Sequence, residues 1–258
     1  MTGSRPLLLI PTAMEREQLH AALRQQKARG LSVWDRFQVE TCGFGLVAAA
    51  AMTMRHLSLH RPSRVVLAGI AGSLGPECKV GSAYWFGSVV CDGIGVGEAD
   101  SFQSAATLGW NQLDGGTCGA PIADRLDLVL PVRARPVHAR AGRAELGLVS
   151  RCAASANRPA AMTVRRRVTP THASGGTDPV AAFSYAAEDM EGFAVALACQ
   201  IAGVPVSIVR GISNEAGDRN HAGWQIDSAI AGIAESLIEY AHLAPLVRGE
   251  PRGNTGPG

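Results

Sequence analysis

A carboxylate and an amide stand near opposite ends of one stretch of the chain, residues 188–229. Glu191 lies close to its start, and Asn214 lies further along it. A carboxylate accepts hydrogen bonds from hydroxyl groups, whereas an amide both donates and accepts. Held near each other, these two side chains would grip a small polar ligand from two sides.

The residues between them predict a helix followed by a buried strand. Gly203 and Pro205 mark the end of the helix. Residues 204–212 form an almost unbroken apolar run, which is typical of a strand buried on both faces of an α/β sheet. The predicted apolar face of the helix follows the 3, 4 and 7 spacing of Met190, Ala194, Leu197 and Ile201.

Three polar residues, Ser213, Asn214 and Glu215, follow this run, and we expect them in a loop at the end of the strand. Sheets of this class bind ligands outside the carboxyl ends of their strands. The predicted fold alone therefore places this loop where a ligand would bind. Glu191 has apolar neighbours, so its carboxylate needs a hydrogen-bonding partner rather than open solvent.

A second carboxylate, Glu17, lies early in a helix that follows the first predicted strand. Thr12 and Glu15 fit a capping box that opens this helix, which is expected to run to about Lys27. Acidic side chains are favoured in a first helical turn by the helix dipole alone. The position of Glu17 alone therefore does not decide whether it is a catalytic group or an ordinary carboxylate of the first helical turn.

Strands alternate with helices along the rest of the chain, which predicts an α/β fold with a mixed or largely parallel sheet and helices on both faces. We expect one domain over residues 1–244, a surface excursion over 93–119 and a disordered tail over 245–258. The other predicted strands are residues 6–12, 33–41, 64–69, 83–91, 144–150 and 162–169, and the other predicted helix is 46–59.

Composition narrows the classes of function. The chain has 258 residues, 47% of them hydrophobic, and a formal net charge of +2, so it can bury a full core and does not favour a nucleic-acid partner. We expect no signal peptide, no membrane partner and a cytoplasmic location. The six cysteines form no CxxC pair and are expected to be buried thiols of a reducing compartment: Cys42, Cys78, Cys91, Cys118, Cys152 and Cys199.

Several motifs are weak or missing. Gly43, Gly45 and Ala48 match a GxGxxA dinucleotide fingerprint, but the acidic residue expected about twenty positions later is missing, which favours a tight turn with close helix packing. Gly69, Gly72 and Gly75 suit either a ligand approached by backbone amides or a plain turn. We find no Walker A, GxSxG or HExxH sequence, so no metal or cofactor is expected.

Five segments together resemble the nucleoside phosphorylase and nucleosidase superfamily, most closely its futalosine hydrolase branch. The resemblance implies an α/β/α sandwich around a twisted mixed sheet, in a homo-oligomer without cofactor or metal. It also implies hydrolysis of the N-glycosidic bond of futalosine, releasing hypoxanthine in a menaquinone pathway. The segments are TAMERE (12–17), CGFG (42–45), AGIAGSL (68–74), DMEGFAVA (189–196) and RGISNEAGDRNHAGWQI (210–226).

The same resemblance assigns roles to individual residues. Cleaving this bond develops positive charge on the sugar and leaves negative charge on the purine, so a hydrolase needs a base for water and donors for the purine. Glu17 would activate the water, Glu191 would accept the ribose hydroxyls, and Asn214 would donate to the O6 and N7 of a 6-oxopurine. The remaining expected substrate-binding residues are Ala71, Gly72, Met190 and Ser213.

Three alternatives stay open on the same fold. A purine nucleoside phosphorylase is disfavoured because Glu15 and Glu17 would repel phosphate. A nucleosidase for methylthioadenosine or aminofutalosine is disfavoured because adenine-specific relatives carry aspartate at the position of Asn214. The third is a non-catalytic nucleoside-binding module. Residues 169–183 also lack an aromatic side chain where those relatives stack the base.

Overall fold

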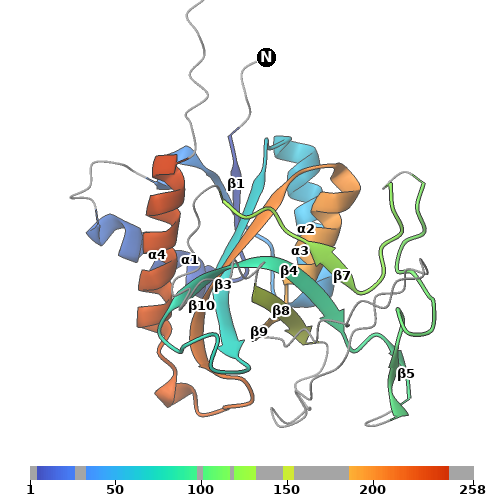
Figure 1. Cartoon of the computed structure of the whole chain (residues 1–258). Helices are drawn as coiled ribbons and strands as arrows, with labels where there is room; N and C mark the ends of the chain where they lie inside the picture. Colours follow the sequence, from blue (N-terminus) through green and yellow to red (C-terminus); the bar gives the residue numbers. More distant parts are fainter. Residues whose placement is uncertain are drawn as a thin grey trace, which may run out of the picture.

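The computed structural model of the chain has a mixed eight-stranded sheet at its centre (Figure 1). It describes residues 5–26, 33–97, 101–116, 119–131, 148–153 and 186–243. The order of strands across the sheet is β10 (Val206–Glu215), β4 (Ala83–Asp92), β8 (Leu148–Ala153), β9 (Ala187–Asp189), β3 (Val65–Ser73), β1 (Leu7–Ile10) and β2 (Gln38–Thr41), with β7 (Arg125–Asp127) paired to β4.

Parallel and antiparallel pairs both occur in this sheet. Strand β3 runs parallel to β1 and β10 but antiparallel to β9. Its pairing with β10 closes a ring of five strands, β10, β4, β8, β9 and β3. Strand β3 therefore has β9 and β10 as neighbours at its carboxyl end, and this arrangement positions the candidate site.

Helices cover both faces of the sheet. Helices α1 (Ala13–Gln25) and α4 (Ile226–Leu243) lie on one face, and α2 (Gly45–His60) and α3 (Gly192–Ala202) lie on the other (Figure 1). Successive side chains of a strand point to opposite faces. In β1, Leu8 and Ile10 accordingly pack in the core under α1 and α4, while Leu7 and Leu9 pack in the core under α2 and α3. The predicted α/β/α sandwich with a mixed sheet is confirmed.

Smaller elements complete the described chain. The predicted surface excursion contains a separate two-stranded sheet of β5 (Gly95–Val96) and β6 (Gln103–Ser104). The predicted strand over 33–41 is instead a short helical turn, η2 (Trp34–Arg36), followed by β2. A second turn, η5 (His221–Gly223), precedes α4.

Two predictions around the candidate site were wrong in detail. Residues 188–189 belong to β9, so the helix begins only at Gly192. The predicted apolar face was also wrong in detail. Ile201, which was placed on it, is 39% exposed, and the first two turns of the helix are buried on most sides because α3 packs against both the sheet and α2. The buried residues are Gly192, Phe193, Ala194, Val195, Ala196, Ala198 and Cys199.

Two strands are longer than predicted. Strand β3 extends to Ser73 because β9 and β10 pair with its end. Strand β10 continues through Ser213 and Asn214, with a register shift between Ile212 and Asn214. Ser213, Asn214 and Glu215, which were predicted in a loop, are therefore the last three residues of β10.

Other predictions have mixed outcomes. The strand predicted at 144–150 is observed at 148–153, while the one predicted at 162–169 and the tail lie outside the described residues. Single-domain organisation stays a prediction. The four cysteines whose side chains the structure describes are free and buried, as expected: Cys42, Cys78, Cys91 and Cys199.

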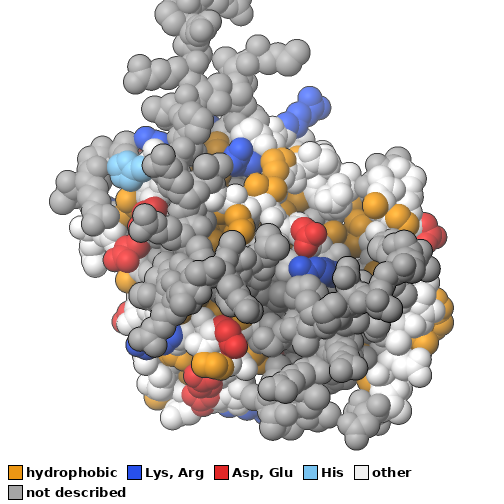
Figure 2. All heavy atoms as spheres, in the orientation of Figure 1, with side chains coloured by type: hydrophobic (Ala, Val, Ile, Leu, Met, Phe, Trp, Pro, Cys, Tyr) orange, Lys and Arg blue, Asp and Glu red, His pale blue; other side chains and the backbone are white. Residues whose placement is uncertain are grey.

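The surface carries mixed charge. On the face drawn in Figure 2, the described basic side chains are scattered among acidic ones rather than gathered into one patch. No helix in the described ranges has the length and apolar character needed to cross a bilayer.

Candidate active site

A tight turn between β2 and α2 brings a backbone N–H to Glu191. Gly43 and Gly45 adopt φ angles of 84° and 81°, which side chains disfavour. A Cβ on Gly43 would lie only 2.9 Å from the Cβ of Ala48, so the GxGxxA element is a close-packed turn, as favoured above. The N–H of Gly45 donates to Glu191 Oε1 at 3.0 Å.

Arg210 holds the other oxygen of Glu191. It lies in the middle of β10 with no exposed surface, and Glu191 at the start of α3 is only 3% exposed. The Arg210 guanidinium donates from Nη2 to Glu191 Oε2 at 3.3 Å and from Nε to Asp189 Oδ2 at 2.8 Å. The expectation that Glu191 has a buried hydrogen-bonding partner is confirmed.

These contacts shift the acidities of both residues. Burial raises the pKa of Glu191, and the Arg210 guanidinium opposes that rise without cancelling it. Burial alone would lower the pKa of Arg210, but Asp189, Glu191 and Glu15 outweigh burial and raise it. Arg210 is therefore a permanent cation, and Glu191 is a carboxylate held in a site that disfavours its charge.

Glu15 completes this buried charge cluster. It is 3% exposed, and its Oε2 accepts the N–H of Thr12 at 3.1 Å and the Thr12 hydroxyl at 2.6 Å. The predicted capping box is thus confirmed. Its Oε1 accepts the N–H of Ile70 at 2.9 Å. Asp189 and Glu191 thus contact the guanidinium of Arg210 directly, and the nearby carboxyl group of Glu15 acts on it electrostatically.

Gly69 makes this approach possible. A Cβ at this position would overlap Arg210 Nη1 and lie 2.9 Å from Glu15 Oε1. Strand β3 must therefore pass the cluster without a side chain. Gly72, three residues further, would bring a Cβ to 3.2 Å from the backbone of Ala216.

The amide side of the site lies at the ends of β3 and β10. Asn214 pairs with Gly72, and Gly72 also pairs with Glu188 of β9, so the end of β3 joins the two halves of the site. The Ser213 hydroxyl donates to Asn214 Oδ1 at 2.7 Å, with Ala71 O as a longer alternative at 3.3 Å. Asn214 Nδ2 donates to Glu215 O at 2.7 Å. Because Ser213 donates to the amide oxygen and Glu215 O accepts one N–H, the second N–H of Asn214 is the polar group left for a ligand.

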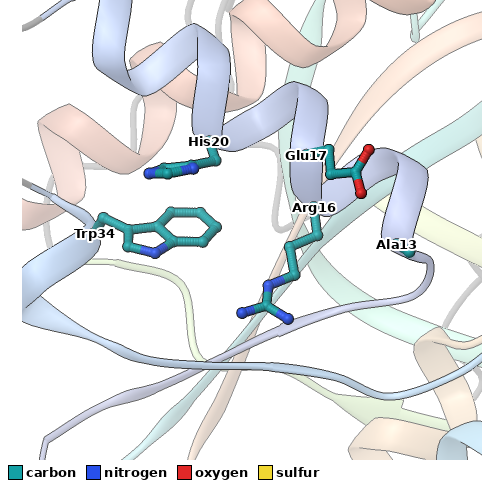
Figure 3. Close-up of a pocket in the computed structure, with 5 residues that line it drawn as sticks. All are labelled: Ala13, Arg16, Glu17, His20 and Trp34. Atoms are coloured by element: carbon teal, nitrogen blue, oxygen red, sulfur yellow. The ribbon is translucent and has the colours of Figure 1, made fainter.

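The structure brings together six of the seven residues predicted for the site. Met190 is half-buried and directly precedes Glu191. Glu17 is the exception because it is exposed on α1, on the far side of the helix from Glu15. It lines a depression of about 300 Å³ with Ala13, Arg16 and the stacked pair His20 and Trp34 (Figure 3).

Arg210, Asp189 and the site-facing position of Glu15 were not predicted from the sequence. One signal was present: an arginine inside an otherwise apolar strand requires a buried partner. A second was the four-residue spacing of Glu15, Leu19 and Leu23, which places all three on the buried face of α1.

This fold and site have known relatives. The family model of the Phosphorylase superfamily matches residues 177–241. A futalosine hydrolase of Streptomyces coelicolor is 30% identical over 220 residues, which are 83% of this chain and 80% of that protein.

Solved structures agree on the fold. The native structure of futalosine hydrolase from Helicobacter pylori has a TM-score of 0.58 at 15% identity, covering 93% of this chain and 97% of that one. A 5′-methylthioadenosine/S-adenosylhomocysteine nucleosidase of the same organism has a TM-score of 0.56 at 14% identity, covering 94% and 99%. Together with the sequence match, these likenesses show that the chain belongs to the futalosine hydrolase family of the phosphorylase superfamily.

Proposed function

We propose that the protein hydrolyses the N-glycosidic bond of futalosine and releases hypoxanthine, as a step in menaquinone biosynthesis. The observation that carries this proposal is the buried cluster around Arg210, which lies beside the carboxyl ends of β3 and β10. There, Arg210 and the Gly45 N–H hold Glu191 by both oxygens, and the amide of Asn214 lies at the same edge of the sheet.

The charge of this cluster suits the reaction. The bond breaks with positive charge developing on the sugar. Three carboxyl groups around one guanidinium leave a surplus of negative charge that stabilises such a cation, and their positions are fixed before the substrate arrives. Glu191 would accept the ribose hydroxyls with its remaining lone pairs, with Met190 against the sugar.

The amide of Asn214 would recognise the purine. Ser213 donates to Oδ1, and one N–H of the amide already donates to Glu215 O, so the second N–H is left to donate to the O6 or N7 acceptor of hypoxanthine. The backbone at Ala71 and Gly72, beside Asn214, would form the adjoining wall of the base pocket. This arrangement favours a 6-oxopurine over adenine, so a nucleosidase for methylthioadenosine is the weaker alternative.

Two glutamates of α1 are candidates for the base that activates water. The family resemblance assigns this role to Glu17, and that assignment stays a proposal. The position of Glu15 supports it as the base, because its Oε1 lies beside Gly69 in the buried cluster, as does Arg210 Nη1. We favour Glu15, since Glu17 faces a different surface of α1 in the described structure. Either carboxylate also disfavours a phosphate co-substrate at the first turn of α1, and therefore a phosphorylase.

We further propose a homo-oligomer in the reducing cytoplasm. Exposed apolar side chains along α2 support the oligomer: Phe44, Val47 and Met54 are 66%, 86% and 39% exposed. The free buried thiols of Cys42, Cys78, Cys91 and Cys199 agree with a reducing compartment.

The test is an assay with futalosine, inosine and methylthioadenosine, each with and without phosphate, in which the released base is identified. We expect hypoxanthine from futalosine without phosphate. A strict requirement for phosphate would make the protein a phosphorylase, and release of adenine alone would make it an adenine nucleosidase.

A further inference from the structure

A second cluster of polar side chains lies between helix α2 and the edge strand β2. His56 and His60 are four residues apart and therefore share one face of α2. Glu40 lies on β2. One nitrogen of each ring and one carboxylate oxygen lie within 4.8 Å of one another.

The hydrogen bonds of His56 fix which of its nitrogens is free. Its ring is 5% exposed, and Nε2 lies 3.1 Å from the carbonyl oxygen of Thr41. A carbonyl can only accept, so Nε2 carries the proton and Nδ1 carries a lone pair. Within the described ranges this buried Nδ1 has no hydrogen-bond partner. A buried acceptor left without a donor is costly, and a missing ion or water commonly explains it.

His60 and Glu40 are close without being properly hydrogen-bonded. His60 Nε2 lies 3.1 Å from Glu40 Oε1, yet this nitrogen has no aligned hydrogen bond to any described residue. Two ligand atoms that bind one tetrahedral zinc ion are about 3.3 Å apart, because each bond to zinc is about 2.0 to 2.2 Å long. The separation of these two atoms therefore suits a shared cation as well as a shared proton.

Outer contacts hold two of the three side chains in orientation. Thr41 O accepts from the far nitrogen of His56, and Gln38 Nε2 donates to Glu40 Oε1 at 2.8 Å. Metal ligands in proteins have such outer partners, which fix the ring tautomer and the carboxylate. The cluster thus has the donors of a metal site and the supporting contacts as well.

We propose that His56 Nδ1, His60 Nε2 and a carboxylate oxygen of Glu40 bind a zinc ion. Two imidazoles and one carboxylate are a donor set that zinc accepts, with a fourth position for water. The side chains of His60 and Glu40 are 21% and 27% exposed, so solvent reaches that position. One possible ligand atom of each residue lies within 4.8 Å of the others, so small side-chain rotations would bring the three to one ion.

Sequence motifs alone predict no metal site in this chain. The two histidines have the four-residue spacing of HExxH without its glutamate, and the third ligand comes from a preceding strand. The arginines nearby, Arg55 and Arg61, line a separate depression with Ser58 and Leu59.

The site is structural rather than catalytic. His56 and His60 follow Gly45 on α2 by 11 and 15 residues, so at about 1.5 Å per residue the ion would lie about 16 to 22 Å along the helix from the Gly45 N–H that holds Glu191. Bound zinc would tie the edge strand β2 to α2. Zinc is therefore expected to raise Tm and to leave the turnover number unchanged.

The experiment uses the full chain without an affinity tag, stripped of metal by chelation and dialysis. Zinc binding is measured by equilibrium dialysis in the presence of excess magnesium, and cobalt binding by visible absorption. We expect one zinc ion per chain, a cobalt spectrum of tetrahedral or five-coordinate type, and a higher Tm with zinc.

Four variants assign the ion to this cluster. Glu40→Gln and His60→Gln, both at half-buried positions, are expected to lose the cobalt spectrum and the rise in Tm. Gln38→Ala keeps all three ligands and is expected to bind zinc about tenfold more weakly. His242→Gln removes an exposed histidine at the end of α4 and is expected to bind as the original chain does. Absence of stoichiometric zinc, or binding that persists in both Glu40→Gln and His60→Gln, would overturn the proposal.

Discussion

The backbone N–H of Gly45 donates to Oε1 of Glu191 at 3.0 Å, across 146 residues of chain. Arg210 Nη2 donates to Oε2 of the same carboxylate at 3.3 Å. Glu191 therefore has a fixed donor on each oxygen before any substrate binds. A carboxylate held in this way can orient a ribose ring without rearranging, which is the geometric requirement for placing an anomeric carbon beside a water.

Replacing this carboxylate should impair catalysis more than folding. We expect Glu191→Gln to lower kcat/KM for futalosine by about 10²- to 10³-fold, the usual effect of removing one electrostatic contact from an active site. The fold should persist because Arg210 keeps its pairing with Asp189. Steady-state kinetics and Tm measure the two effects, and Glu239→Gln, an exposed change on α4, is the control. Unchanged kcat/KM in Glu191→Gln would remove Glu191 from the site.

The pH dependence should report the same group. Burial raises the pKa of Glu191, with Arg210 opposing, from the ordinary value of 4.5. Only the ionised form accepts both ribose hydroxyls, so kcat/KM should decrease as the pH is lowered. The midpoint of this decrease should lie above pH 4.5, because the pKa of Glu191 is raised. Because the folded protein also holds this proton more tightly, the residue's contribution to stability should decrease as pH rises from 4.5 through the raised pKa.

Glu191→Gln is the control for both measurements. The variant should lose the acid limb that belongs to Glu191 from its profile of kcat/KM against pH. The difference in Tm between the two proteins should change over the same pH interval. An acid limb that is identical in the two proteins would assign that limb to another group.

The fold class could be predicted from the sequence because it depends on local patterns. Apolar runs alternate with helical periodicity, and the stops at Gly203 and the capping box at Thr12 and Glu15 set element ends correctly. The details of α3 could not be predicted in this way. Its burial on most sides depends on packing against α2, which no local pattern reveals.

The candidate site could be predicted only where a residue's position in its own element decides its place. Glu191, Ser213 and Asn214 meet this condition, since each lies at an element end. The partners of Arg210 do not, because Asp189 reaches it through the short strand β9, whose pairing with β3 covers only two residue pairs. The choice between Glu15 and Glu17 depends on which face of α1 meets the sheet.

Gly69 should be intolerant of any side chain. We expect Gly69→Ala to destabilise the protein by about 1 to 3 kcal/mol, because the added methyl group overlaps Arg210 and crowds Glu15 in a packed interior. Chemical denaturation measures the loss. Gly223→Ala is the matched control, because a Cβ there meets only Asn220 Nδ2, at 3.9 Å. Equal stability of the two variants would mean that the guanidinium moves aside freely.

Paired substitutions should identify the base that activates water. We expect Glu15→Gln to lower kcat by about 10²- to 10⁴-fold, the usual contribution of a general base, and Glu17→Gln to stay close to the original rate. Glu15→Gln should also lower Tm, because Glu15 closes the capping box. Single-turnover rates with saturating futalosine separate chemistry from binding. The opposite pattern, with a large loss only in Glu17→Gln, would support the residue assigned by family resemblance.

Substitution of the amide should change which purine is preferred. In Asn214→Asp, a protonated carboxyl can donate to N7 and accept from a 6-amino group, whereas an ionised one repels O6. The ratio of kcat/KM for futalosine to that for a 6-amino nucleoside should therefore fall by about 10-fold or more. A tenfold change corresponds to about 1.4 kcal/mol, which is the free energy of one polar contact. Ser213→Ala is the companion variant. It removes the hydroxyl that orients the amide but keeps the NH₂, so it should weaken binding of both substrates without reversing their order. A ratio that is unchanged in Asn214→Asp would show that the base is recognised elsewhere.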